Sequence, residues 1–347
     1  MIDTIRYFLW RVWLWATKNQ REDRFNKLVD WHSQDPFKYG VLPSNPEKEY
    51  EYPKLDIGQS EDVIEFFLQN SKRQLLFARI SRLGNGYASM SFLVRLGDKG
   101  SWKAESVVVD RSTSDSFVAG GLRIESTLPM RRYRISFNGV VHNAKNEATH
   151  LRAIFVGNHI TACGDYRVFH DNAFLAKQLP FSAKLESLEK LDIYVQTFSL
   201  TGKIYVEELE DEVYLWGYRR RQRLGRDTGD VELKARITAY TENGLGLDLN
   251  EASVKHLSPT LLFGHLNYPA FQQRPVQNFS ADSIIGAQHF RIGAAQFKNL
   301  RFVVKDTLDE ISWIEPLGTE WLRFRAKIVG VDYDGNVGNA LITIANE

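Results

Sequence analysis

The chain has 347 residues, a length that suits two domains of ordinary size or one large all-β body. Hydrophobic residues make up 43% and charged residues 25% of the sequence, which excludes wholesale disorder and a polytopic membrane protein. The 44 Lys and Arg nearly balance the 43 Asp and Glu, and the resulting formal charge of +1 argues against nucleic acid as the main partner.

The first segment, residues 1–26, is predicted to form a short amphipathic helix. On a helical projection, an apolar stripe that includes Phe8 and Val12 runs opposite Arg11. The apolar run is too short to cross a hydrocarbon core of ~30 Å, and no small-residue cleavage site of a signal peptide follows it. Two interpretations stay open: residues 2–16 lie in a membrane interface, or the helix docks on the body of the protein or on a second subunit. We therefore expect a cytoplasmic protein, either free or peripheral at a membrane surface, of unknown oligomeric state.

Residues 27–60 are predicted to be an extended linker that wraps over the body, because Pro and Gly recur through them without a regular period. From residue 61 onward the sequence is rich in β-forming residues. Two such runs flank Gly84-Asn85-Gly86, which is a strong signal for a hairpin. Further strand candidates lie at 121–127, 130–141 and 149–157, and in most of the chain after residue 190.

Several of these candidates alternate apolar and polar residues, as expected for a sheet with one face on a core. Tyr133, Ile135 and Phe137 fall on one face of their strand, while arginines fall on the other. Arg325 and Lys327 alternate in the same way with an apolar set. The 21 Phe, 14 Tyr and 8 Trp of the chain suit a large apolar interior.

The predicted fold is all-β, with two tandem antiparallel barrels after the N-terminal helix. Turn residues recur about every 10 to 15 residues, as in up-and-down sheets. A break near 169–191, with short helices expected at 172–179 and 182–191, divides the strands into similar halves. The first barrel is therefore placed at 61–180 and the second at 181–347. One large sandwich is the alternative architecture.

Three short motifs resemble a known family: Arg-Tyr-Arg-Ile-Ser-Phe-Asn-Gly within 131–139, Leu-Trp-Gly-Tyr-Arg at 215–219 and Phe-Gly-His-Leu at 263–266. On these motifs the chain is similar to the double lipocalin-like family of carotenoid hydratase (hydroxyneurosporene synthase) and tocopherol cyclase relatives. It most resembles the lipocalin-like segment of animal phosphoenolpyruvate-synthase-like proteins. The resemblance implies lipocalin-like barrels, an apolar cavity, and cofactor-free hydration, cyclisation or isomerisation of an isoprenoid-like or polyketide-like substrate.

One strand departs from the family pattern. In the family, the strand that begins Trp-Gly continues with an Arg and then with an Asp-His-type polar pair. Trp216, Gly217 and Arg219 match that pattern, but Arg220 and Arg221 take the place of the pair. The departure removes the acid and base expected on this strand, because arginine stays charged at neutral pH.

Proton transfer is therefore assigned to a compact cluster elsewhere, Asp165, Tyr166, His170 and Asp171, which lies in the stretch Gly-Asp-Tyr-Arg-Val-Phe-His-Asp. These residue types can serve as general acids and bases once their pKa values are tuned by the fold. The alternative is a polar loop with an Asx turn.

Ligand binding is assigned to Trp216, Arg219, His265 and Tyr268, with core filling as the alternative for the aromatic residues. The run 219–226 holds five arginines, which suit an anionic headgroup or a phosphate. The interpretation favoured for this run is that the nearby acidic stretch, residues 207–212, neutralises it from a neighbouring strand.

No metal or cofactor is expected, because Cys163 is the only cysteine and the eight histidines do not cluster at ligand spacings. The predicted function is the binding or cofactor-free conversion of an apolar small molecule in a barrel cavity. Two alternatives stay open: a non-catalytic interaction or accessory domain of a phosphotransferase-like system, and a carbohydrate-binding β-sandwich.

Overall fold

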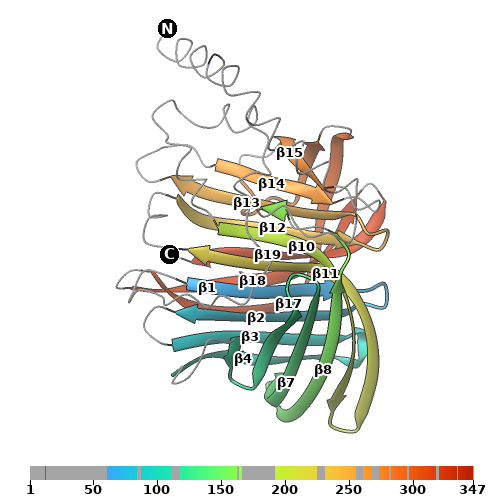
Figure 1. The fold of residues 1–347 in the computed structure, drawn as a ribbon. Coiled ribbons are helices and arrows are strands. Elements are labelled where there is room, and N and C mark those ends of the chain that lie inside the picture. The colour runs from blue at the N-terminus through green and yellow to red at the C-terminus, as the bar shows by residue number, and fades with distance from the viewer. Residues whose placement is uncertain are drawn as a thin grey trace.

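The structure is a computed structural model that describes residues 61–346 with several gaps, together with Val12 (Figure 1). The gaps fall at 84–86, 111–116, 162–163, 166–191, 225–230, 255–260, 268–272, 281–282, 295–296, 318–319 and 334. The described part consists of nineteen strands and one short 3-10 helix at Gly97–Lys99.

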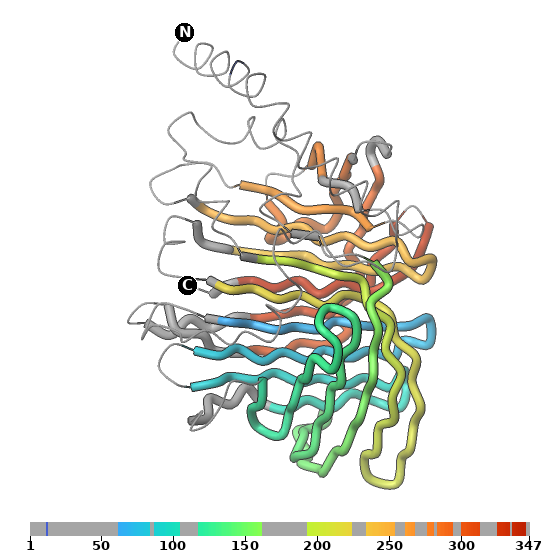
Figure 2. Tube along the Cα trace, in the orientation of Figure 1, coloured from blue at the N-terminus to red at the C-terminus, as the bar shows by residue number. Residues whose placement is uncertain are grey.

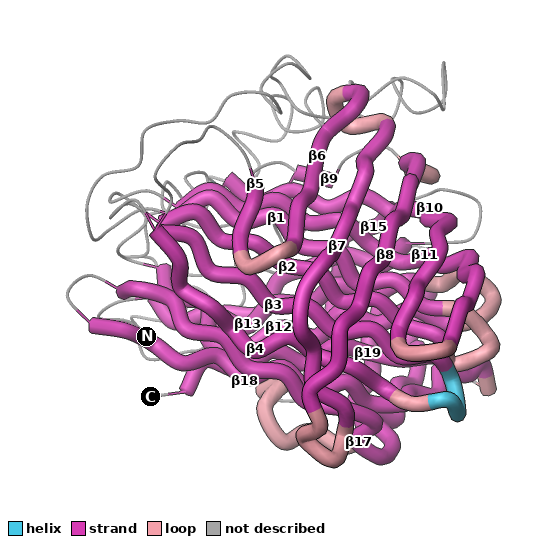
Figure 3. Tube along the Cα trace, turned by 90° about the horizontal axis from the view of Figure 1, so that it is seen from below, coloured by secondary structure: helices cyan, strands magenta, loops and turns pink. Residues whose placement is uncertain are grey.

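Eleven strands form the first sheet. Their bounds are β1 (Glu61–Gln69), β2 (Gln74–Leu83), β3 (Tyr87–Leu96), β4 (Ser101–Asp110), β5 (Phe117–Ala119), β6 (Leu122–Leu128), β7 (Arg132–Asn143), β8 (Ala148–His159), β9 (Gly164–Asp165), β10 (Asp192–Val206) and β11 (Leu209–Leu224). Eight of them hydrogen-bond in the order β4-β3-β2-β1-β11-β10-β8-β7, and a short pairing between β4 and β7 joins the two ends. The result is a barrel-like ring, which we call the first barrel. The hairpin of β5 and β6 continues from β7, and β5 contacts β2, β3 and β4 (Figure 3).

The second barrel is closed and follows the order of the chain. Its strands are β12 (Val231–Thr241), β13 (Gly246–Val254), β14 (Leu261–Asn267), β15 (Gln273–Phe279), β16 (His289–Ala294), β17 (Phe297–Leu317), β18 (Glu320–Tyr333) and β19 (Asn336–Asn346). Each strand pairs with the next, and β19 returns to pair with β12. The two barrels lie against each other, with β17 in contact with β2, β3 and β4 of the first (Figure 2).

The tandem barrels confirm the predicted fold class and rule out one large sandwich, but the boundary between them lies later than predicted. Strands β10 and β11, placed in the second barrel by the sequence, complete the first barrel between β1 and β8. The first barrel therefore extends to Leu224, and the second begins with β12 at Val231. The error has a physical cause: β11 pairs with β1 at the very start of the body, and such a distant partner leaves no local signal in the sequence.

Each barrel has its own apolar core, formed by the inward residues of alternating strands. Tyr133, Ile135 and Phe137 are buried in the first core, as their alternation predicted. In β18, Ala326 and Ile328 are buried, while Arg325 and Lys327, which alternate with them, are exposed. The strands predicted on either side of residues 84–86 are β2 and β3, and they pair antiparallel as expected for a hairpin.

Three predictions lie outside the described residues. These are the helices at 172–179 and 182–191, the linker at 27–60, and all of the N-terminal helix except Val12, which is helical and exposed. Within the described part of the chain, no helix has both the length and the apolar character needed to span a bilayer.

Candidate functional site

Strand β11 carries arginines on both of its faces. Arg219 and Arg221 stand opposite Phe66 and Ile64 of β1 and point, like those core residues, into the first barrel. Arg220 takes the other face, toward the second barrel, where it contacts β13. All three are 3% exposed or less. Because a buried guanidinium is costly unless it is paired, its partners identify the polar centres of the fold.

The acidic stretch 207–212 does not neutralise these arginines, so the interpretation favoured from the sequence is wrong. This stretch lies at the opposite end of β11. There, Lys99 Nζ donates to Asp211 Oδ2 at 2.7 Å, and Lys203 Nζ donates to Glu210 Oε1 at 3.4 Å. The carboxylates beside the arginine run come instead from β1. All of β1 pairs with the second half of β11, from Trp216 to Leu224.

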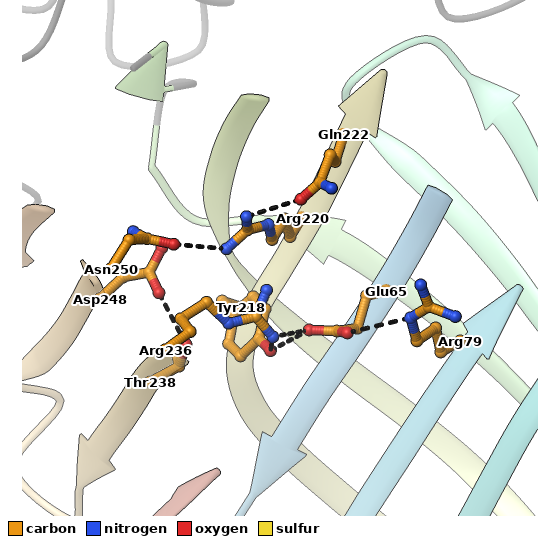
Figure 4. A network of polar contacts seen from close by, with 9 residues as sticks. All are labelled: Glu65, Arg79, Tyr218, Arg220, Gln222, Arg236, Thr238, Asp248 and Asn250. Carbon is orange, nitrogen blue, oxygen red and sulfur yellow. Dashed lines mark hydrogen bonds and ion pairs between the residues drawn. The ribbon is translucent and has the colours of Figure 1, made fainter. Parts of the chain in front are cut away.

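Glu65 of β1 is the centre of a polar network between the two barrels (Figure 4). Its Oε1 accepts hydrogen bonds from the Tyr218 hydroxyl of β11 and from the Arg236 guanidinium of β12. Arg236 Nη2 also donates to Tyr218 Oη at 2.8 Å. Arg79 Nε of β2 lies 3.6 Å from Glu65 Oε2. One buried carboxylate thus joins three strands of the first barrel's ring to the first strand of the second barrel.

Arg220 extends this network over the outer face of the second barrel. Its Nη1 donates to Asn250 Oδ1 of β13 at 3.1 Å, and its Nη2 donates to Gln222 Oε1 at 2.7 Å. On the neighbouring strand, Thr238 Oγ1 donates to Asp248 Oδ1 at 2.6 Å. We call the whole set the inter-barrel network: Glu65, Arg79, Tyr218, Arg220, Gln222, Arg236, Thr238, Asp248 and Asn250 (Figure 4).

Asp248 has a titratable neighbour, His265 of β14, which stands directly opposite it in the β13–β14 pairing. Leu249 and Leu266 belong to the core of the second barrel and alternate with these two residues. Asp248 and His265 therefore point out of the second barrel, on the face that carries Asn250 and meets Arg220. Asp248 is 0% and His265 1% exposed, so both act in a medium of low dielectric constant.

The charge states of the pair follow from burial and from the nearby arginines. Burial lowers the pKa of His265, and the positive charge of Arg220 acts in the same direction, while Asp248 opposes both. Burial alone would raise the pKa of Asp248, but Arg220, Arg236 and the other partners hold it below its ordinary value. The pKa of Glu65 is lowered for the same reason, against its own burial. Near neutral pH the site therefore holds two carboxylates and a neutral imidazole.

Neutral hydrogen bonds continue the contact between the barrels. Gln69 of β1 donates to the backbone oxygen of Tyr240 and accepts from the Asn339 side chain. Asn267 Nδ2 donates to Tyr240 Oη at 3.2 Å. The rings of Tyr218 and Tyr240 stack with centroids 6.3 Å apart, and burial raises the pKa of both phenols. Directional contacts of this kind specify one arrangement of the barrels.

A metal ion does not fit the arrangement of these groups. Among the residues that the structure describes, no set of three or more His, Cys, Asp or Glu is placed to hold one. Arg220 and Arg236 lie close enough to Asp248 to lower its pKa, and two such charges would repel a cation there.

The predicted catalytic cluster falls mostly outside the described residues. Asp165 is described as part of β9, with its backbone opposite Tyr194 of β10. Tyr166, His170 and Asp171 lie in the gap that follows. Their assignment to proton transfer stays a prediction.

The predicted ligand residues occupy different places. Arg219 lies inside the first barrel, whereas His265 lies on the outer face of the second. Trp216 is half-buried on the outer face of β11, with its ring centroid 6.2 Å from that of Tyr214. Tyr268 is not among the described residues. Of the three described residues, Trp216 and His265 lie on strand faces that also carry members of the inter-barrel network, whereas Arg219 lies on the opposite face of β11.

Sequence reasoning missed Glu65, Asp248 and Arg236. Asp248 and Arg236 each stand at the polar position of an alternating strand, as Arg236 does between Ala235 and Ile237, and that pattern ordinarily means a solvent-facing side chain. Glu65 is instead a single charged residue within an apolar run of β1. The site exists because the other barrel covers this face. Contact between two barrels is a tertiary property, which an alternating pattern does not contain.

Comparison with known proteins gives a likeness of fold. No family model matches the sequence, and no curated protein matches it. A putative AttH from Nitrosomonas europaea superposes with a TM-score of 0.50 at 11% identity, covering 90% of this chain and 98% of that one. Kievitone hydratase from Nectria haematococca gives a TM-score of 0.51 at 10% identity, covering 90% and 97%.

Neither comparison supports the narrower resemblance to animal phosphoenolpyruvate-synthase-like proteins. At such low identities the likeness concerns the fold and not the activity. The chain shares its tandem β-barrel fold with these two proteins, and the resemblance is confirmed for the fold alone.

Proposed function

We propose that the protein binds an apolar small molecule beside the inter-barrel network and converts it by proton transfer, with His265 as the general base. The observation that carries this proposal is the buried pair of Asp248 and His265 close to Arg220. A neutral imidazole can accept a proton, and the adjacent carboxylate stabilises the imidazolium that forms. A fixed guanidinium stabilises negative charge as it develops on the substrate.

These groups suit a substrate whose C=C double bond is conjugated with a carbonyl group. In hydration, His265 takes a proton from water and the water oxygen bonds to the β-carbon. The electrons of the C=C bond shift toward the carbonyl carbon, and the C=O electrons move to the oxygen. The resulting enolate carries its negative charge on that oxygen, near Arg220. The imidazolium then returns its proton to the α-carbon. In isomerisation, the same base moves a proton from one carbon to another through the same enolate.

Cyclisation follows the same course when a hydroxyl group of the substrate replaces water as the nucleophile. Hydration that begins with protonation of an isolated alkene fits the network less well. Asp248 and Glu65 are held ionised, and the pKa values of the neighbouring phenols are raised. The described site thus offers a base and an oxyanion partner rather than a strong acid.

The fold comparison guides the choice of the first reaction to test. Kievitone hydratase is named for a hydration, and it shares this fold at 10% identity. That likeness supports testing hydration before the other two reactions, and it specifies no substrate for this chain.

The test uses the full-length protein with a series of apolar conjugated enones in ¹⁸O-labelled water and in D2O. Mass spectrometry then measures ¹⁸O incorporated at the β-carbon and deuterium incorporated at the α-carbon. We expect His265→Gln to lower the labelling rate by about 100-fold, the range typical of a lost general base. His289→Gln, which alters an exposed histidine of β16, is the matched control and should label at the wild-type rate.

The same assay decides between this site and the cluster predicted from the sequence. If Asp165→Asn or His170→Ala loses at least about tenfold in rate, equivalent to 1.4 kcal/mol of barrier, while His265→Gln keeps full activity, the role of base moves to that cluster. Native mass spectrometry of the purified protein provides an independent test of binding, because a co-purifying apolar ligand is expected.

A further inference from the structure

The strand that carries His265 presents a second polar side chain on the same outer face of the second barrel. Asn267 lies two residues further along β14, and Leu266 between them belongs to the core of that barrel. Because side chains alternate along a strand, His265 and Asn267 point out of the barrel on the same side, about 7 Å apart along the strand. One water molecule can bridge two polar side chains at this spacing.

The position opposite Asn267 has no side chain of its own. Gly246 of β13 stands opposite Asn267, as Asp248 stands opposite His265. The ring of Tyr240, on β12, lies over Gly246, because a Cβ atom there would come within 2.6 Å of Tyr240 Cε1. Across this glycine, Asn267 Nδ2 donates to Tyr240 Oη at 3.2 Å. Tyr240 thus holds the nitrogen end of the Asn267 amide group.

The oxygen end of the same amide group is an orphan acceptor. Asn267 is 2% exposed, and no donor among the residues that the structure describes reaches its Oδ1. A buried carbonyl oxygen without a donor costs free energy, and folded proteins ordinarily satisfy such groups with ordered water. The burial of Asn267 keeps bulk solvent away from this oxygen. Its Oδ1 is therefore a binding position for a small donor, on the face that carries the proposed base.

We propose that Asn267 Oδ1 binds the water molecule that attacks the substrate in hydration, an inference that rests on the proposed function. The water donates one hydrogen bond to the neutral imidazole of His265 and the other to Asn267, which leaves a lone pair of its oxygen for the β-carbon. His265 takes the first proton as the C–O bond forms. The second hydrogen stays on the oxygen and becomes the hydroxyl hydrogen of the product. Asn267 keeps its charge and its covalent bonds throughout.

This role predicts a difference between two reactions of the same base. Removal of a proton from the γ-carbon of an enone needs His265 but no attacking water, whereas hydration needs both. The full-length protein is therefore given enones with γ-hydrogens in ¹⁸O-labelled water and in D2O, and mass spectrometry measures ¹⁸O at the β-carbon and deuterium at the γ-carbon. Asn267→Leu, which is similar in size but has no acceptor, should lower the ¹⁸O rate at least about tenfold more than the deuterium rate. An equal fall in both rates would overturn the proposal.

Tyr240→Phe is the matched control for the structural role of Asn267. It removes the same Asn267–Tyr240 hydrogen bond and leaves Oδ1 in the protein, so it should keep the wild-type ratio of the two labelling rates. Asn158→Leu, at an exposed position of β8, should keep that ratio as well. If Tyr240→Phe changes the ratio as much as Asn267→Leu does, the effect comes from packing around Tyr240, and the proposal fails.

A high-resolution crystal structure of the wild-type protein tests the binding position without any substrate. We expect an ordered water within about 3.2 Å of Asn267 Oδ1 and within hydrogen-bonding distance of a ring nitrogen of His265. An Oδ1 without such a water would contradict the proposal, and this measurement decides if Asn267→Leu does not fold. It also separates the two proposals, because a water bound at Asn267 in a protein that labels no enone would remove the proposed function and leave the water site in place.

Discussion

Glu65 and Arg236, 171 residues apart in the sequence, form an ion pair across the contact between the two barrels. Both partners are buried, and the hydroxyl of Tyr218 completes the group. The pair therefore couples the position of β1 to that of β12, on which the Asp248–His265 face depends.

Replacing Glu65 by Gln leaves Arg236 and Arg79 buried without their shared counter-ion. Breaking a buried ion pair on one side typically costs about 3–5 kcal/mol, and we expect a loss of that order in the free energy of unfolding in urea. Glu310→Gln is the control, because its ion pair with Arg325 lies at the surface and should contribute less than about 1 kcal/mol. Equal losses in the two variants would show that Glu65 has no special role at the interface.

The stability of the protein should rise with pH up to about pH 4 through Asp248 and Glu65, and up to about pH 6.5 through His265. The pKa values of His265, Asp248 and Glu65 are lowered in the folded state, so below the unfolded values, about 6.5 for His and 4 for carboxyl groups, the unfolded chain binds more protons. The contribution of these three groups to the free energy of unfolding is complete above the unfolded pKa values. It is lost as the pH falls through the pKa values of the folded state. Urea unfolding across this range should give a flatter profile near pH 6 for His265→Gln than for the wild type or His289→Gln. Overlapping profiles for all three proteins would remove His265 as a source of the pH dependence.

Gly217 is required by the close approach of β1. A Cβ atom at this position would overlap the backbone oxygen of Phe67 on β1, and backbone cannot move aside as a flexible side chain can. We expect Gly217→Ala to lower the free energy of unfolding by about 1–3 kcal/mol or more. At Gly330, a Cβ would lie 3.5 Å from Lys305 Cβ, an ordinary contact, so Gly330→Ala should be nearly neutral. Melting temperatures of the two variants give the comparison, and a tolerated Gly217→Ala would contradict this packing.

Trp216, the neighbour of Gly217 in the same motif, gives a separate prediction about binding. Its side chain is half-buried on the outer face of β11, the face that carries Tyr218 and Arg220. If Trp216 lines a ligand site, Trp216→Ala should weaken the binding of an apolar fluorescent probe more than it lowers the melting temperature. The reverse order would make the ring part of the packing alone.

The positions of the strands could be predicted from the sequence better than the pairing of one strand with another. The alternation of Tyr133, Ile135 and Phe137 located both β7 and its core face, because a period of two residues is a local property. The partner of β11 is not local. The residues of β1 and β11 that pair are some 150 positions apart in the sequence. Sequence reasoning therefore matched the arginine run with the nearest acidic residues and not with those of β1.

The same limit explains the candidate site. His265 could be singled out because it belongs to a motif, whereas Asp248 and Glu65 belong to none, and Asp248 occupies a position of an alternating strand that normally faces solvent. Asp248 and Glu65 form a site because β1 and β11 of the first barrel contact β12 and β13 of the second. The charge state of His265 is likewise a consequence of burial and of Arg220, neither of which can be read from its neighbours in the sequence.

The most direct test of the central claim is the titration of His265 by NMR in the full-length protein. Its imidazole signals, identified among the eight histidines by their absence in His265→Gln, report the protonation state without any need for a substrate. The account predicts that His265 stays neutral down to a pH clearly below about 6.5, the ordinary value for histidine. Titration at or above that value would mean that His265 is a cation near neutral pH, and it could not then act as the base.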